Sequence, residues 1–328
     1  MTKKLNKIGV LTSGGDSPGM NAAVRAVVRS AEFHNIECFG VYKGFEGLIS
    51  DEIKKLNARS VKNIVNKGGT ILKSARCLEF RTKEGRLEAK NNLDKYGINS
   101  LVVIGGNGSL LGGKIFEEEH GISVVGIPGT IDNDLAGTRC TLGYDTALNT
   151  AVEAIDKIRD TAISHNRLFF IEVMGKGSGH IALNAGIGAG AEEVLIPEKN
   201  MGIDRLLKSL KHSEKSGKSS SIIVVSEGDK IGDNVFKFSS YIEKNFPHYE
   251  TRVSILGHIQ RGGSPSCFDR VLASRMGVFA VDCLLEAKSN VMVGIIGDKI
   301  VTVPIDDALK GGQEIDKELV RVCDIISI

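Results

Sequence analysis

The chain alternates short apolar runs with longer amphipathic stretches. The stretches at 19–33 and 145–161 space their apolar residues as amphipathic helices do. Apolar runs that are interrupted by such helices are typical of parallel strands buried on both faces. The pattern therefore predicts an α/β fold. The apolar runs lie at 8–11, 101–105, 123–127, 168–174, 221–225 and 253–256.

Glycine is concentrated directly after several of these runs. Gly14 and Gly15 follow the first run, and the segment GGNGS at 105–109 ends another. Glycine lets the backbone approach a ligand closely, and a helix start offers unpaired N–H groups to an anion. Because ligands of parallel sheets bind at the carboxyl ends of the strands, both loops are predicted to bind phosphate, with Ser109 as a further contact. For either loop alone, a tight strand-to-helix turn is the alternative.

Two acids follow the next strand, in the segment GIPGTIDNDLAGT at 126–138. Asp132 and Asp134 are two residues apart, and on an extended segment such side chains point to the same side. Two neighbouring carboxylates favour different tasks, one holding a metal ion and the other accepting a proton. A hydrogen-bonded turn is the alternative, because Asp and Asn are common turn residues.

Basic residues also flank the predicted strands. Guanidinium groups match phosphate oxygens in a bidentate way. His258 and Arg261 lie together beside glycines and are predicted to bind phosphate, whereas for an isolated arginine a solvated surface charge is the simpler interpretation. The other candidates of this kind are Arg76, Arg167, Lys176 and Arg252.

The overall charge and composition narrow the class of protein. A formal net charge of +2 gives no broad basic field, so neither nucleic acid nor a membrane surface is an expected partner. No apolar run approaches the ~20 residues needed to cross a bilayer. The six cysteines are scattered without a C-x-x-C pair, which favours reduced thiols in the cytoplasm. None of the seven histidines has zinc-binding spacing.

Taken together, the motifs resemble the bacterial-type 6-phosphofructokinases, the ATP-dependent phosphofructokinase family A. They occur in the family's order over nearly the whole chain, and a set of this kind is far more specific than one glycine-rich loop. The motifs are TSGGDSPGMNAAVR at 12–25, GGT-x-L-x-SAR at 68–76, PGTIDND at 128–134, EVMG at 172–175, GAEEVLIPE at 190–198 and LGHIQRGGSP at 256–265.

The resemblance implies a cytoplasmic, allosteric, homotetrameric kinase of glycolysis. Its reaction would phosphorylate fructose 6-phosphate at the 1-hydroxyl with Mg-ATP, giving fructose 1,6-bisphosphate and ADP. The implied fold has two similar three-layer α/β/α domains with mainly parallel sheets and the active site in the cleft between them. We expect a larger ATP-binding domain at 1–143 plus about 256–307, and a smaller fructose 6-phosphate-binding domain at about 144–255 plus 308–328.

The resemblance also implies a role for individual residues. Asp132 resembles the catalytic base, and Thr130 and Asp134 would flank the reacting phosphoryl group. Gly15 and Arg76, near the ATP phosphates, complete the implied catalytic set. The implied ATP-binding residues are Gly15, Arg76, Cys77, Gly106, Asn107, Gly108 and Ser109, with Asp134 and Asn107 at the Mg²⁺ ion. The implied sugar-phosphate ligands are Thr130, Asp132, Met174, Gly175, Lys176, Glu227, His258 and Arg261, with Arg167 and Arg252 supplied by a neighbouring subunit. The implied effector ligands are Arg25, Arg29, Arg159, Glu192 and Lys218.

Several positions depart from the family pattern. Asn107 stands where the family usually has Asp, which removes a charge from the metal site. Lys73 stands where glycine is usual, Lys176 replaces Arg, and His180 replaces an acid. Regulation stays open, because the positions that often hold Arg, Asp and Lys at the effector site hold Ala58, Asn63 and Ser216.

Two glycines favour ATP as the phosphoryl donor. Pyrophosphate-dependent relatives tend to have Asp and Lys at the positions of Gly108 and Gly129. An acid at 108 would crowd out the α-phosphate of a nucleotide, whereas glycine leaves space. The alternatives are a pyrophosphate-dependent relative and a catalytically weak or regulatory subunit that binds sugar phosphate, for which Asn107 is the main argument.

Overall fold

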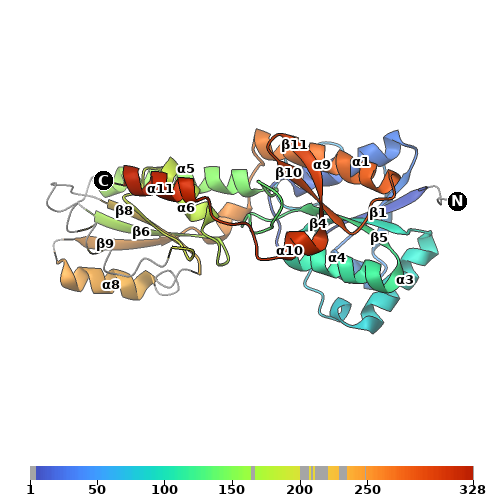
Figure 1. Cartoon of the computed structure of the whole chain (residues 1–328), viewed down its shortest axis with the longest axis horizontal. Coiled ribbons are helices and arrows are strands. Elements are labelled where there is room, and N and C mark those ends of the chain that lie inside the picture. Colours follow the sequence, from blue (N-terminus) through green and yellow to red (C-terminus); the bar gives the residue numbers. More distant parts are fainter. Residues whose placement is uncertain are drawn as a thin grey trace. The chain divides into compact units, whose positions relative to one another are not determined.

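The computed structural model describes residues 5–163, 167–199, 207, 210, 221–228, 235–247 and 249–327. The chain forms two compact units (Figure 1). Unit 1 comprises Met1–Thr146 and Arg261–Gln313, and unit 2 comprises Ala147–Gln260 and Glu314–Ile328. The chain passes between the units at three points, each a few residues after a boundary expected from the sequence, at 143, 255 and 307.

Unit 1 contains a seven-stranded sheet in the order β11-β10-β5-β4-β1-β2-β3. The strands from β10 to β2 pair in parallel, and the edge strands β11 and β3 pair antiparallel. The strands are β1 (Lys7–Thr12), β2 (Glu37–Val41), β3 (Ile53–Leu56), β4 (Ser100–Gly105), β5 (Ser123–Pro128), β10 (Val291–Ile296) and β11 (Lys299–Pro304).

Helices cover both faces of this sheet. Figure 1 shows α1 and α9 on one face and α3 and α4 on the other. Alternate residues of β1 enter different cores, Ile8 and Val10 on the α1 side and Leu11 on the α4 side. The helices are α1 (Met20–Phe33), α2 (Phe45–Ile49), α3 (Lys83–Tyr96), α4 (Asn107–His120), α9 (Cys267–Leu285) and α10 (Ile305–Leu309), with a short 3₁₀ helix η1 (Glu79–Arg81).

Unit 2 contains a four-stranded parallel sheet in the order β7-β8-β6-β9. Leu168, Phe170, Ile223 and Phe238 form part of its core. The mainly parallel α/β fold predicted from the sequence is confirmed. The elements are α5 (Tyr144–Ile163), β6 (Arg167–Val173), α6 (His180–Gly188), β7 (Glu193–Leu195), β8 (Ser221–Ser226), α8 (Val235–Asn245), β9 (Glu250–Ile255), η3 (Gly257–Arg261) and α11 (Lys317–Ile326).

Asp269 joins the first turn of α9 to the start of α5. Its Oδ1 accepts a hydrogen bond from Gly143 N (2.9 Å), and its Oδ2 accepts from Thr146 N (2.9 Å) and Thr146 Oγ1 (2.5 Å). The side chain is fully buried, and this burial raises the pKa of the carboxyl group. The three donors compensate for the loss of water around the charge.

We expect Asp269→Asn to lower the free energy of unfolding of unit 1 by roughly 2 kcal/mol, because the new amide directs its own N–H groups at backbone donors. The urea midpoint followed by circular dichroism measures this. Asp282→Asn is the matched control, since Asp282 lies on the same helix with its side chain 42% exposed. Equal midpoints for the two variants would contradict the assigned role of Asp269.

Candidate active site

Three loops meet at the carboxyl edge of the unit 1 sheet. They follow β1, β4 and β5, which are adjacent and parallel. Ser13 N donates to Ile104 O (3.0 Å), and Gly129 N donates to Gly105 O (3.0 Å). A Cβ atom on Gly105 would lie 2.5 Å from Ser13 O and 2.6 Å from Ser109 Oγ. The loops are therefore in direct backbone contact, and a side chain at position 105 would force them apart.

Helix α4 begins within the second of these loops. Gly106 caps the helix, and its carbonyl accepts from Ser109 N (2.9 Å) and Leu110 N (3.1 Å). The first N–H groups of a helix have no partner within it and carry a partial positive charge. Gly108 is exposed, and a Cβ atom there would meet nothing within 4 Å. The start of α4 can therefore receive a phosphate group.

Asn107 and Asp134 form a hydrogen-bonded pair at this edge. Asn107 Nδ2 donates to Asp134 Oδ2 at 2.9 Å. The remaining oxygens, Asn107 Oδ1 and Asp134 Oδ1, are buried and accept no hydrogen bond from any residue that the structure describes. Amide and carboxylate oxygens are ligands that Mg²⁺ uses. The pair therefore fits a hard divalent cation that also binds phosphate oxygens.

The segment after β5 is not extended, so the prediction that Asp132 and Asp134 point to the same side of an extended segment is wrong. Asn133, between them, has a φ of 51°, in the left-handed region. Its Oδ1 accepts from Thr141 N (2.9 Å), and its Nδ2 donates to Arg139 O (3.2 Å). Asn is among the few residues that adopt this conformation readily, so the structure has the hydrogen-bonded turn that the sequence offered as the alternative.

Thr130 and Asp132 are buried inside this turn. Their exposed fractions are 7% and 4%. Asp132 N donates to Thr130 Oγ1 (3.2 Å), and Thr141 Oγ1 donates to Thr130 O (2.5 Å). Thr141, which the sequence did not single out, thus fixes the backbone that carries both residues. A Cβ atom on Gly106 would lie 3.6 Å from Thr130 Cβ, so the turn and the start of α4 are neighbours.

The loop that carries Arg76 and Cys77 lies beside the β1 loop. Ser74 Oγ donates to Gly14 O at 2.8 Å. Arg76 is exposed, whereas Cys77 is half-buried against the hydrophobic core that contains Phe80. The side chain of Arg76 is therefore available to a ligand at the carboxyl edge.

Arg86 supports this loop from within unit 1. Its Nη1 donates to Phe80 O (2.9 Å), while Nε and Nη2 bind Glu119 Oε2 and Oε1 at 2.6 and 2.8 Å. The Arg86 side chain is only 8% exposed. Its hydrogen bonds lower the pKa of Glu119, and Glu119 in turn raises the pKa of Arg86. Both groups therefore stay charged, and the end of the loop stays anchored.

Arg261 belongs to unit 1 and lies against the β1 loop. Its Nη1 donates to Asp16 O at 3.4 Å. A Cβ atom on Gly15 would come within 2.8 Å of the same nitrogen. Glycine at position 15 thus lets a guanidinium group approach the backbone of a predicted phosphate-binding loop.

A second set of predicted residues lies at the carboxyl edge of the unit 2 sheet. Met174, Gly175 and Lys176 follow β6, Glu227 follows β8, and His258 follows β9. The loops touch through their backbones, because position 227 donates to the carbonyl of residue 173 (2.8 Å) and accepts from the N–H of residue 177 (3.3 Å). The side chains of residues 176, 227 and 258 are exposed.

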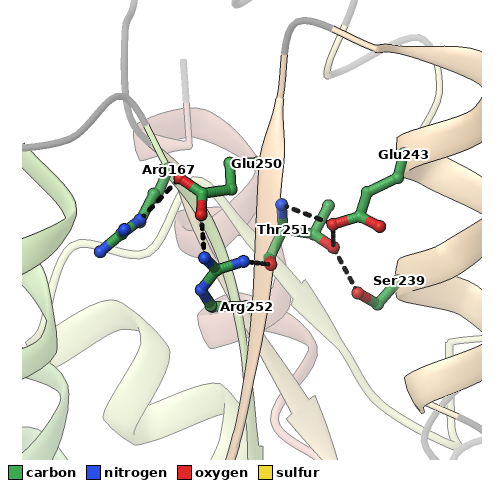
Figure 2. A network of polar contacts seen from close by, with 6 residues as sticks. All are labelled: Arg167, Ser239, Glu243, Glu250, Thr251 and Arg252. Atoms are coloured by element: carbon green, nitrogen blue, oxygen red, sulfur yellow. Dashed lines mark hydrogen bonds and ion pairs between the residues drawn. The ribbon is translucent and has the colours of Figure 1, made fainter.

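Arg167 and Arg252 lie toward the opposite, amino end of the same sheet (Figure 2). Arg167 Nε binds Glu250 Oε2 at 3.0 Å, and Arg252 Nη2 binds Glu250 Oε1. Arg252 Nη1 also donates to Thr251 O at 2.8 Å. Within unit 2, the structure therefore does not bring these two arginines together with His258.

The predicted effector ligands are divided between the units. In unit 1, Arg25 and Arg29 line a surface groove of about 340 Å³ beside α9. Burial, and then the neighbouring Arg29, lower the pKa of Arg25. In unit 2, Arg159 Nη1 lies 3.5 Å from Glu192 Oε1. Lys218 lies outside the described residues.

Among the residues that the structure describes, no three His, Cys, Asp or Glu side chains form a potential metal site. Among the same residues, no helix has the length and apolar character needed to cross a membrane.

Comparison with known proteins gives consistent matches. The family model described as Phosphofructokinase matches residues 7–284. ATP-dependent 6-phosphofructokinase 2 of Bacteroides thetaiotaomicron is 50% identical, over 98% of each chain. ATP-dependent 6-phosphofructokinase of Bacillus subtilis is 53% identical, over 99% of this chain and 100% of its own. Phosphofructokinase from Saccharomyces cerevisiae has a TM-score of 0.88 at 38% identity, over 98% of this chain and 46% of its own.

Proposed function

Since the chain belongs to the phosphofructokinase family, we propose that it is an ATP-dependent 6-phosphofructokinase of glycolysis. It transfers the γ-phosphoryl group of ATP to the 1-hydroxyl of fructose 6-phosphate, giving fructose 1,6-bisphosphate and ADP. The observation that carries this proposal is the convergence on one sheet edge of the start of α4, buried Asp132 and the Asn107–Asp134 pair.

The nucleotide binds at the carboxyl edge of unit 1. N–H groups at the start of α4 and the Arg76 side chain bind its phosphates, while Gly15 permits a close approach. The remaining residues of this proposed site are Gly106, Asn107, Gly108, Ser109 and Cys77.

ATP is the donor in this proposal, and two glycines support it. The open space beside Gly108 leaves room for a nucleotide. A Cβ atom on Gly129 would lie 3.0 Å from Met20 Cε and 3.2 Å from Ile104 Cγ2. The lysine that we expect of pyrophosphate-dependent relatives would therefore need its neighbours to move.

Asp132 acts as the general base that accepts the proton of the sugar hydroxyl, and Thr130 lies beside the reacting phosphoryl group. Such a reaction depends mainly on alignment, one base and charge neutralisation. Mg²⁺, held by the donor phosphates and by Asn107 and Asp134, would supply part of that neutralisation. The hydrogen bond between these two side chains keeps both free oxygens in place before the ion binds.

We assign the remaining predicted ligands to the sugar phosphate. The positive charges of Arg261 and Lys176 suit its phosphate, the imidazole N–H of His258 can donate to it, and Glu227 can accept hydrogen bonds from its hydroxyl groups. Met174 and Gly175 complete the set, together with Thr130 and Asp132.

We further propose a cytoplasmic homotetramer in which active sites are shared between subunits. Arg167 and Arg252 lie toward the sheet end opposite to His258, so each serves a neighbouring subunit's sugar phosphate. Glu250 holds both guanidinium groups ready for that contact. Arg25, Arg29, Arg159 and Glu192, with Lys218, are the proposed ligands of an allosteric effector.

The direct test is formation of fructose 1,6-bisphosphate by the purified chain with ATP or pyrophosphate as donor. We expect turnover with ATP alone. Asp132→Asn should lower kcat by about 10²–10⁴-fold, the usual contribution of a general base, with unchanged ATP binding in calorimetry. Asp298→Asn, at an exposed turn, is the control and should stay active. Turnover with pyrophosphate, or an Asp132→Asn variant that keeps full activity, would overturn the proposal.

If active sites are shared between subunits, two inactive variants should restore each other's activity in mixed oligomers. Asp132→Asn loses the base, and Arg252→Ala should lower kcat/KM for fructose 6-phosphate by roughly 10²-fold. When the two variants are dissociated together and reassembled, mixed oligomers contain some sites with neither substitution. We therefore expect activity well above that of the separately treated parents. No recovery, in oligomers that mass spectrometry shows to be mixed, would mean that Arg252 serves its own subunit.

A further inference from the structure

Lys73 has an unfavourable backbone conformation for a lysine. Its φ is 60°, in the left-handed region, and Lys73 N closes a turn by donating to Thr70 O at 3.1 Å. An L residue with a Cβ atom pays about 1 kcal/mol or more in this conformation, which glycine adopts freely. A strained residue beside a binding site is a reason to ask what its side chain does.

The backbone of Lys73 is fastened to the phosphate-binding edge. Its carbonyl oxygen accepts a hydrogen bond from Thr12 Oγ1 (2.9 Å), at the end of β1. The next residue, Ser74, donates to Gly14 O (2.8 Å). A Cβ atom on Gly14 would in turn lie 3.4 Å from Ser109 Oγ, at the start of α4. Lys73 is thus part of the same cluster of loops.

The ammonium group of Lys73 is not used within the described structure. The side chain is exposed, and no described residue pairs with it. Lys43 provides a contrast, since it also has a positive φ (63°) but its Nζ binds Glu52 at 2.6 Å. The charge of Lys43 has a structural partner, whereas that of Lys73 remains available to a ligand.

The loop after β4 has the neutral Asn107 where a carboxylate would attract a cation more strongly. Asn107 offers Mg²⁺ an oxygen without a full charge, so the ion is held less strongly than by two carboxylates. We propose that Lys73 binds the phosphate chain of the nucleotide. Its ammonium group adds positive charge at the phosphates, which compensates for the weaker binding of Mg²⁺ at Asn107. The inference rests on the proposed ATP site. An ammonium group on a flexible stem suits this task, because it follows phosphate oxygens without a fixed geometry.

The test uses Lys73→Gly, Lys73→Asn and Lys73→Arg in the full chain. Gly and Asn both tolerate the left-handed conformation but remove the charge, whereas Arg keeps it. Calorimetry with ADP and ATP, with and without Mg²⁺, should show roughly three- to tenfold weaker binding for the Gly and Asn variants. We expect the KM for ATP to rise in parallel, and the KM for fructose 6-phosphate to stay unchanged. The Arg variant should bind within about twofold of the unmodified chain.

The melting temperature and the salt dependence of ATP binding distinguish a lost phosphate contact from a disturbed fold. Lys73→Gly should melt no lower than the unmodified chain, because it relieves the strain. Its affinity for ATP should also fall less steeply with added KCl, since one charge contact is missing. The proposal is overturned if Gly and Asn variants bind ATP like the unmodified chain with the same salt dependence. Binding is measured without turnover, so this failure is distinct from an absence of kinase activity.

Discussion

The close backbone contact of the loops after β1, β4 and β5 is the constraint on which the rest of unit 1 depends. Parallel pairing brings the three carboxyl ends to one edge, and Gly105 allows the loops to touch there. Every group proposed for phosphoryl transfer in this unit lies on these loops or is fastened to them. Ser74 ties the Arg76 loop to Gly14, and Thr141 fixes the turn around Asp132.

The amide at position 107 is compatible with catalysis on this geometry. An aspartate there would face Asp134 as a second carboxylate, and the two would repel each other until a cation bound. Asn107 instead donates a hydrogen bond to Asp134 and leaves one oxygen on each side chain for the metal. A subunit that had lost catalysis would have no need of this arrangement or of a buried Asp132. The pair therefore favours the proposed working site over a silenced one.

The local elements could be predicted from the sequence, because apolar runs and glycine clusters report burial and tight turns directly. What could not be predicted depends on contacts between distant residues. Asp269 reaches Gly143 and Thr146 across the chain, and Glu250 binds arginines from two strands only because β6 and β9 pair in this register. The turn at Asn133 was open in the sequence, because Asp and Asn suit a turn, whereas the spacing of Asp132 and Asp134 alone favoured an extended backbone.

The most direct measurement is a Mg²⁺ titration of the unmodified chain and of Asn107→Asp, read both by fructose 1,6-bisphosphate formation and by thermal melting without nucleotide. We expect both proteins to reach similar kcat, with roughly tenfold less Mg²⁺ needed by the variant. Without metal, the variant should melt at a lower temperature than the unmodified chain, and added Mg²⁺ should raise its melting temperature more. If the unmodified chain stays inactive at any Mg²⁺ concentration while the variant is active, then Asn107 marks a silenced site and the proposed catalysis is wrong.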